Sequence, residues 1–216
     1  MSINKKKKKR IQSLGEEIAN SITHGIGAGL SIAALVILVV FAALQGDAWK
    51  IVSFSIYGVS LFALYLTSTL YHSFTNPKLK QFFHVLDHSA IFLLIAGTYT
   101  PILLISMRGV LGWTLFGLIW ALALGGIVFK IFFFEKFKIL SVLFYVGMGW
   151  LVVIAGKPVL EMVPTSVNLW LLIGGIFYTV GVVFYITKKI PFQHGIWHLF
   201  VLGGSVSHFF GMLQYF

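Results

Sequence analysis

The stretch PFQHGIWHLFVLGG, residues 191–204, opens a long apolar segment and places His194 and His198 four residues apart. Residues at this spacing lie on one face of an α-helix, with Cβ atoms about 5–6 Å apart. Ionisable side chains are rare in membrane-spanning segments, and those that occur usually face the interior of the bundle and mark a functional site. We therefore predict that both histidines face partners inside a helix bundle.

Composition assigns the class of protein. The chain has 216 residues, of which 58% are hydrophobic and 10% are charged, whereas soluble domains carry about 25% charged residues. A chain with so few charged side chains cannot cover its apolar surface in water, so the sequence predicts an integral membrane protein. It contains no cysteine, which excludes disulfides and thiolate metal ligands.

Seven segments are apolar over about the 20 residues that a membrane-spanning helix needs. They cover residues 20–44, 51–73, 85–106, 110–129, 139–156, 167–187 and 193–213. The breaks between them are too short to fold as domains. The sequence thus predicts an all-α, seven-transmembrane-helix bundle at residues 20–214, preceded at residues 1–19 by a basic cytoplasmic tail and the start of the first helix.

Basic residues are distributed unevenly between the two sides of this predicted bundle. One side holds the N-terminal tail and the loops after the second, fourth and sixth segments. It carries 13 Lys and Arg residues, whereas the other side carries 3. Because basic loops stay in the cytoplasm, we predict a cytoplasmic N-terminus, an outside C-terminus and a multi-pass location in a bacterial plasma membrane. The run KKKKKR at residues 5–10 is interpreted as a topology signal that also contacts anionic lipids. No fold follows it to read a nucleic-acid groove, so nucleic acid is not an expected partner.

With this orientation, polar side chains from four segments fall at the same cytoplasmic depth. They are Glu17, Asn20 and His24 on one face of the first segment, Ser68 and His72 in the second, Asp87 and His88 at the start of the third, and His194 and His198 in the last. Random placement would scatter such residues over both leaflets. Their common depth indicates one polar site inside the bundle.

The residue types in this site suit a metal ion. Two imidazoles at i and i+4 can both bind one zinc ion at about 2.0–2.1 Å, and a third histidine leaves one position open, which is the usual catalytic arrangement. Water bound to such an ion has its pKa lowered to about 7, and Asp87 lies at the depth needed to take its proton. The H-x-x-x-H spacing alone is weak evidence, but the spacing joined to Ser68-x-x-x-His72 and a lone intramembrane aspartate is much more specific.

These residues also carry a resemblance to a known family. The sequence resembles the progestin and adipoQ receptor superfamily, and more closely its bacterial hemolysin III branch. The matching stretches are EEIANSITHGIG (16–27), STLYH (68–72), LDHSAIFLLIAGTYTP (86–101) and HGIWHLFVLGGSVSHFFG (194–211). They occur in the order that the family has and span nearly the whole chain.

The resemblance implies roles for individual residues. In the adiponectin-receptor members the corresponding S-x-x-x-H histidine and both H-x-x-x-H histidines bind zinc, and the aspartate at the head of the third helix holds the zinc-bound water. Carried over, the zinc ligands are His72, His194 and His198, with Asp87 on the water; Ser68 lies one turn deeper and supports the ligands. The chain departs from those members by lacking a sizeable cytoplasmic domain and by having His88 directly after the aspartate, where it is a candidate competing ligand.

Other polar and small residues have more ordinary interpretations. His84 is expected to form hydrogen bonds at the interface, and His208, about 21 Å from His194 along a helix, to be a buried hydrogen-bonded side chain. Glu17 and His24 are expected to tie the first helix to the polar site rather than to bind metal. The small residues Gly25, Gly29, Gly117, Ala121 and Gly125 are interpreted as positions of close helix packing.

Three functions follow from these features. The ceramidase activity associated with the adiponectin-receptor branch implies a zinc-dependent intramembrane hydrolase that acts on a lipid amide or ester in the inner leaflet. The hemolysin III name implies a membrane-perturbing cytolysin, although the segments show no amphipathic pore-lining stripe and no ring of charges. In the third, a non-catalytic membrane sensor, zinc only clasps the second and seventh helices.

Overall fold

The structure is a computed structural model that describes residues 12–133, 137–187 and 190–216. The basic run at residues 5–10, interpreted above as a topology signal, lies outside the described residues. So do Lys136, Lys188 and Lys189, which are among the 13 basic residues assigned to the cytoplasmic side. Within those ranges every regular element is a helix and none is a strand.

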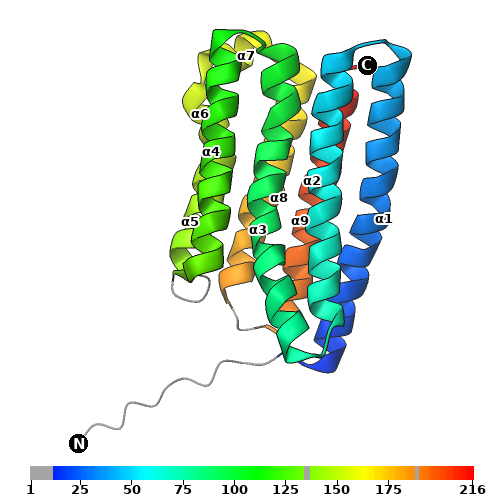
Figure 1. The fold of residues 1–216 in the computed structure, drawn as a ribbon, viewed down its shortest axis with the longest axis vertical. Helices are drawn as coiled ribbons and strands as arrows, with labels where there is room; N and C mark the ends of the chain where they lie inside the picture. Colours follow the sequence, from blue (N-terminus) through cyan, green and yellow to red (C-terminus); the bar gives the residue numbers. More distant parts are fainter. Residues whose placement is uncertain (1–11, 134–136, 188–189) are drawn as a thin grey trace, which may run out of the picture.

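The helices follow one another with short connections (Figure 1). Their bounds are α1 Leu14–Leu44, α2 Ala48–Ser73, α3 Pro77–Pro101, the π-helix η1 Ile102–Ser106, α4 Val110–Phe133, α5 Lys138–Gly149, α6 Leu151–Ala155, α7 Lys157–Met162, α8 Thr165–Thr187 and α9 Gln193–Leu213. Five of the apolar segments predicted from the sequence end at the same residue as a helix does, namely Leu44, Ser73, Ser106, Thr187 and Leu213.

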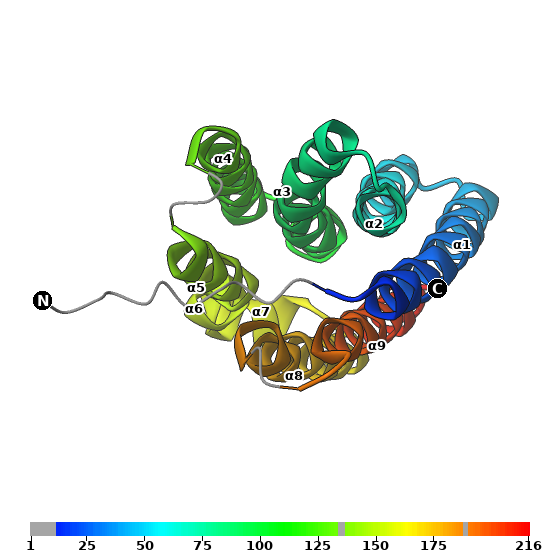
Figure 2. The same cartoon turned by 90° about the horizontal axis from the view of Figure 1, so that it is seen from below.

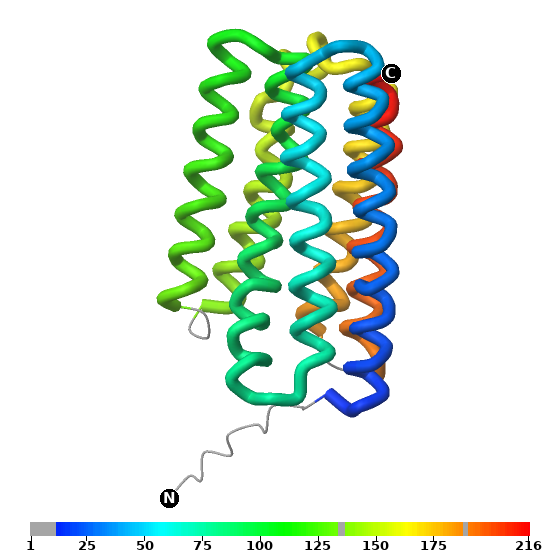
Figure 3. Tube along the Cα trace, turned by 45° about the vertical axis from the view of Figure 1, so that its right-hand side comes forward, coloured from blue at the N-terminus to red at the C-terminus, as the bar shows by residue number. Residues whose placement is uncertain are grey.

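The helices stand side by side in a ring whose order follows the sequence. Seen along the bundle, α1, α2, α3 and α4 form one arc, and α5, α8 and α9 return to α1 (Figure 2). Figure 3 shows the same arrangement of helices from the side. We call the end at which α1, α3 and α9 begin the lower end, as drawn in Figure 1, and the opposite end, where the chain terminates at Phe216, the upper end.

Side-chain caps fix the first turns of three helices. Ser13 and Glu16 form a capping box at the start of α1, and Asn76 accepts from the backbone N–H groups of Lys78 and Leu79 at the start of α3. Asp47 caps α2 in the same way. Because of its capping box, α1 begins six residues before the apolar segment predicted at residue 20, so its first two turns carry polar side chains into the lower end of the bundle.

In the part of the chain that the structure describes, six helices are long and apolar enough to cross a membrane. The fifth predicted segment, residues 139–156, coincides instead with two shorter helices: α5 ends at Gly149, Trp150 interrupts the helix, and α6 continues to Ala155. Gly156 has a φ of 53° and starts the turn into α7. Six such helices in one chain make the protein a multi-pass membrane protein.

Apolar side chains cover both the inside and the outside of this bundle. Leu38, Phe54, Tyr57 and Phe92 are fully buried between the helices. The outer surface exposes many large apolar side chains, such as Ile154 at 80%. A bilayer solvates such a surface favourably, whereas water does not.

Close packing occurs at different glycines from those predicted. Among the described residues, a Cβ atom added at Gly29, Gly117 or Gly125 would meet nothing within 4 Å, so the prediction for these positions is wrong. A Cβ atom at Gly126 or Gly174 would instead collide with a neighbouring side chain, Phe92 in the first case and His208 in the second. The sequence spacing identifies a small-residue stripe, but the rotation of each helix decides whether that stripe faces a neighbour or lipid.

Candidate metal centre

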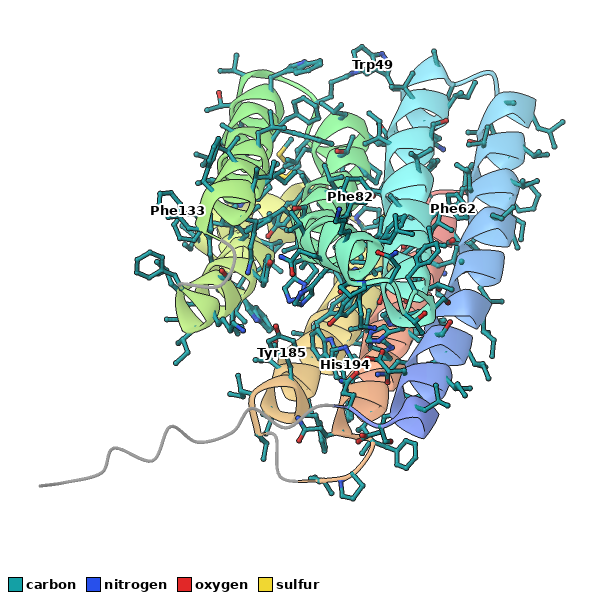
Figure 4. All side chains as sticks on the ribbon, turned by 60° about the horizontal axis from the view of Figure 1, so that its bottom comes forward. Trp49, Phe62, Phe82, Phe133, Tyr185 and His194 are labelled. Carbon is teal, nitrogen blue, oxygen red and sulfur yellow. The ribbon has the colours of Figure 1, made fainter. Side chains whose placement is uncertain are left out.

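Three histidines meet at the lower end of the bundle. One imidazole nitrogen of His72, one of His194 and one of His198 all lie within 4.8 Å of one another. The ring centroids are 4.5 Å apart for the two α9 residues, and His72 on α2 lies 5.1 Å from His194 and 5.2 Å from His198. Figure 4 shows His194 at this end of the bundle beside Tyr185 of α8, with Trp49 at the opposite end. The structure thus brings together the three residues that the sequence selects.

The orientation of His72 is set by a carboxylate from α1. Its Nδ1 lies 2.7 Å from Glu17 Oε2, and Glu17 Oε1 lies 3.1 Å from Lys80 Nζ of α3. A carboxylate can only accept hydrogen bonds, so Nδ1 of His72 carries the proton and Nε2 carries the lone pair. That Nε2 is buried and has no hydrogen-bond partner among the described residues. A buried lone pair without a donor is suited to a metal ion.

His198 is held in the same tautomer by the backbone. Its Nδ1 lies 3.3 Å from the carbonyl oxygen of Asn20 on α1. Because a carbonyl oxygen accepts, this nitrogen donates and Nε2 again carries the lone pair. Two of the three histidines therefore have their metal-binding nitrogen fixed by contacts with α1.

Glu16 positions the start of α9, and so the two histidines that it carries. Its Oε2 accepts from the N–H of Ser13 in the capping box, while its Oε1 accepts from the N–H of Phe192 at 2.9 Å. Phe192 is the N-cap of α9 and has a left-handed φ of 56°. One buried carboxylate thereby joins the first turn of α1 to the first turn of α9.

Asp87 lies beside the three histidines but is not one of the grouped ligands. Its carboxylate Oδ2 is 3.5 Å from His88 Nδ1. His88 is turned toward α8 and α5: its Nε2 is 3.1 Å from the hydroxyl of Tyr185, and its carbonyl accepts from the hydroxyl of Tyr145 at 2.9 Å. The structure therefore leaves His88 outside the three-histidine group, where the sequence had offered it as a competing ligand.

His24 and Ser68 are buried next to this group. The ring of His24 stacks on that of His198 with centroids 3.4 Å apart, and neither of its nitrogens has a hydrogen-bond partner among the described residues. His24 is not in the group whose nitrogens could share one ion. Ser68 is 1% exposed and, like His24, lines the large cavity described next.

An apolar cavity of about 580 Å³ extends from the histidine group. Its lining includes Ser68, Asp87, His194 and His198 at one end, and it continues between α3, α5, α8 and α9 past mostly aliphatic side chains to Asn168. A cavity of this size and composition is typical of a binding site for a mainly apolar ligand with a polar group at one end.

The two remaining histidines lie away from this group. His84 stacks on Tyr71 with ring centroids 4.4 Å apart, which places it at the interface between α2 and α3. His208 Nε2 is 3.3 Å from the carbonyl oxygen of Leu171. The prediction that His208 is hydrogen-bonded is confirmed, and the residue is partly rather than fully buried.

Sequence reasoning missed several partners of the site. Lys80 had been counted only among the basic loop residues, and Tyr145 and Tyr185 had not been singled out. Glu16 carries the signal of a capping box with Ser13, but that motif does not predict its contact with Phe192. Lys80 lies about two helical turns before Asp87 on the same helix, whereas no motif marks Tyr145 or Tyr185.

The sequence is similar to known proteins along nearly its whole length. The profile of the family described as "Haemolysin-III related" matches residues 12–209. The chain is 57% identical to "Hemolysin-3" of Bacillus cereus, covering 94% of this chain and 93% of that protein, and 58% identical to "Hemolysin-3 homolog" of Bacillus subtilis (strain 168), covering 94% and 95%. It is 33% identical to the human "Monocyte to macrophage differentiation factor", covering 93% of this chain and 84% of that protein. The polar stretches of α1, α2, α3 and α9 that surround the histidine group all fall within the matched region. Because the family profile covers most of the chain, the chain belongs to the haemolysin-III-related family.

Proposed function

We propose that the protein is a zinc-dependent intramembrane hydrolase that acts on a lipid amide or ester. His72, His194 and His198 hold the ion, and Asp87 serves as the base. One observation carries the proposal: a three-histidine group lies at the polar end of an apolar cavity of about 580 Å³ that a carboxylate also lines. A binding site for a lipid chain and a site for hydrolytic chemistry are therefore contiguous.

The residues present fit zinc. Three imidazole nitrogens are a common protein ligand set for catalytic zinc. Glu17 and the carbonyl of Asn20 accept the Nδ1 protons of His72 and His198, which is the arrangement usual for zinc-bound histidines. The buried Nε2 of His72 has no partner among the described residues, so a metal ion would satisfy a group that is otherwise costly to bury.

The chain's own residues would supply the remaining chemistry. Zinc held by three histidines supplies a water nucleophile at neutral pH. Asp87, which lines the cavity with its side chain 14% exposed, would accept the proton of the attacking water and then deliver it to the leaving group. The aliphatic cavity holds the acyl chain, which fixes the scissile bond beside the histidine group and keeps bulk water away.

The topology proposed for the chain puts this site in the inner leaflet. We propose a membrane domain at residues 20–214 with seven crossings, the N-terminus in the cytoplasm and the C-terminus outside. The 13-to-3 distribution of basic residues supports this orientation. The seventh crossing is supported by the start of α1 at the lower end and the end of the chain at the upper end (Figure 1), since an odd number of crossings separates the two ends. The fifth crossing would consist of α5 with α6.

A second candidate is a cytolysin. It is favoured by the name of the Bacillus cereus relative, "Hemolysin-3", at 57% identity. The grouped histidines and Asp87 lie at one end of the cavity, and the cavity continues past mostly aliphatic side chains, whereas a pore needs a polar lining through the whole membrane. A third candidate, a zinc clasp without catalysis, is supported by the fact that the three histidines join α2 to α9.

One experiment separates these candidates. Detergent-purified protein is assayed for zinc by elemental analysis, for fatty-acid release from a panel of lipid amides and esters, and for red-cell lysis. A hydrolase contains about one zinc per chain and releases fatty acid. A clasp contains zinc without hydrolysis, and a cytolysin lyses cells whether or not the histidines are intact.

A further inference from the structure

The carboxylate of Glu17 joins three helices at the edge of the histidine group. From α1 it contacts His72 Nδ1 on α2 at 2.7 Å and Lys80 Nζ on α3 at 3.1 Å, using one oxygen for each. Lys80 is itself fixed, since it donates to the carbonyl oxygen of Tyr71 at 3.1 Å and lies over the Tyr71 ring. Both carboxylate oxygens of Glu17 are therefore engaged in directions that hold the group in one orientation.

The two sides of the centre differ in character. Glu17, His72 and Lys80 line a second pocket, of about 440 Å³, together with Ser21 and Ser73, whereas His194 and His198 line the apolar cavity. The Glu17 side chain is 20% exposed and that of His72 is fully buried. Glu17 thus contacts the centre from outside the apolar cavity, so its effect on the metal can be separated from an effect on substrate binding in that cavity.

We propose that Glu17 is a positioning residue of the metal centre, and that Lys80 holds it in place. The proposal rests on the function proposed above, in that it concerns the same three histidines. Glu17 keeps the proton of His72 on Nδ1, orients the ring so that Nε2 faces His194 and His198, and increases the electron density on the coordinating nitrogen. Carboxylates that accept the second N–H of a metal-bound histidine act in this way, and their loss typically lowers metal affinity about 10–100-fold.

A purely structural role for Glu17 would have a different signature. The Glu17–Lys80 pair also ties α1 to α3, so its removal can loosen the lower end without altering the metal ligands. Stability alone is therefore not diagnostic. The affinity of the folded protein for zinc, and the visible absorption of the cobalt(II) form, respond to the ligand geometry at His72.

The test compares Glu17→Leu and Glu17→Gln with wild type in the full-length, detergent-purified protein. Zinc affinity is measured by competition with a chromophoric chelator, and the cobalt(II) spectrum and the thermal unfolding of the metal-free protein are recorded beside it. We expect Glu17→Leu to weaken zinc binding by about 10–100-fold and to change the cobalt spectrum. Glu17→Gln should recover part of the affinity, because its amide oxygen still accepts from His72 although the charge is lost.

Glu161→Gln is the matched control, since Glu161 pairs with Lys157 at the upper end and its side chain is 61% exposed. It should leave the affinity and the spectrum unchanged. Wild-type affinity and spectrum in both Glu17 variants would overturn the proposal while the zinc site itself stands. Absence of zinc from the wild-type protein would overturn the proposed function and this inference together. If Glu17→Leu fails to fold, the nearly isosteric Glu17→Gln decides: unchanged affinity and spectrum overturn the proposal, and a reduced affinity supports it.

Discussion

The imidazole rings of His24 and His198 lie face to face, with centroids 3.4 Å apart and planes inclined by 14°. His198 belongs to the three-histidine group, and His24 does not. The stacked ring of His24 covers one face of the His198 ring, while the ring nitrogens of His198 lie at its edge. His24 therefore helps to fix a ligand by packing rather than by binding the ion.

The first prediction follows from this stacking. Neither nitrogen of His24 has a hydrogen-bond partner among the described residues, so His24→Phe removes two unsatisfied groups and keeps a flat ring against His198. We expect unchanged zinc content and a stability that is equal to or higher than that of wild type, because replacing unpaired buried polar groups by an apolar group of similar shape is nearly neutral or stabilising. Elemental analysis and thermal unfolding check both outcomes. Loss of zinc in His24→Phe would instead make His24 a ligand.

The second prediction concerns metal content. Wild-type protein should hold about one zinc per chain, and the double substitution His194→Ala/His198→Ala should hold almost none, because two of three ligands are lost. His208→Ala is a matched control: the same residue type on the same helix is removed, but His208 contacts the carbonyl oxygen of Leu171 and lies outside the grouped histidines. Equal, negligible zinc in wild type and double mutant would contradict the metal site.

The third prediction tests the topology. The chain has no cysteine, so a single introduced thiol can be labelled without background. Thr75→Cys and Ala48→Cys are exposed positions at opposite ends of α2, at the lower and upper ends of the bundle. In intact cells a membrane-impermeant thiol reagent should label Ala48→Cys and not Thr75→Cys, and a reporter fused after Phe216 should be outside. The reverse pattern would place the histidine group in the other leaflet.

Much of the fold could be predicted because the length and apolarity of a segment decide whether it spans a membrane. The helix ends at Leu44, Ser73 and Leu213 agree with the apolar segments. The start of α1 at Leu14 is set by the capping box of Ser13 and Glu16 and not by hydropathy, and it falls within residues 1–19, where the sequence predicts that the first helix starts. The segment at 139–156 was apolar throughout, so hydropathy could not reveal the break at Trp150.

Sequence reasoning reached the grouping of the histidines and the tie from Glu17 to that group, but not most of the contacts around them. Depth follows from helix direction and residue number, so the common level of His72 and His198 could be inferred. The contacts of Glu17 with Lys80 and of His88 with Tyr185 depend on how each helix is rotated about its axis. The prediction of close packing at Gly117 failed for the same reason. Rotation is fixed by packing between helices, which a single sequence does not specify.

The last prediction separates an enzyme from a clasp, and it concerns Asp87. Asp87→Asn keeps the shape of the side chain and a hydrogen-bonding group beside His88, but it removes the base. If the centre is catalytic, zinc content and fold should be retained while release of fatty acid falls by about 10²–10⁴-fold, the range typical of a lost general base. Glu161→Gln makes the same chemical change at an exposed carboxylate at the upper end and should retain full activity.

The other functions give different results in the same assays. If zinc is only a clasp, no form hydrolyses lipid, Asp87→Asn changes little beyond stability, and His198→Ala loosens α2 from α9 because it removes one of the three groups that join them. If the protein is a cytolysin, red-cell lysis by Asp87→Asn and by the histidine variants stays at the wild-type level, again without hydrolysis. A carboxamide has no basic oxygen at neutral pH and cannot take the proton from the attacking water. Hydrolysis by Asp87→Asn at the wild-type rate would therefore contradict the role of Asp87 as the base, while the zinc site itself would stand.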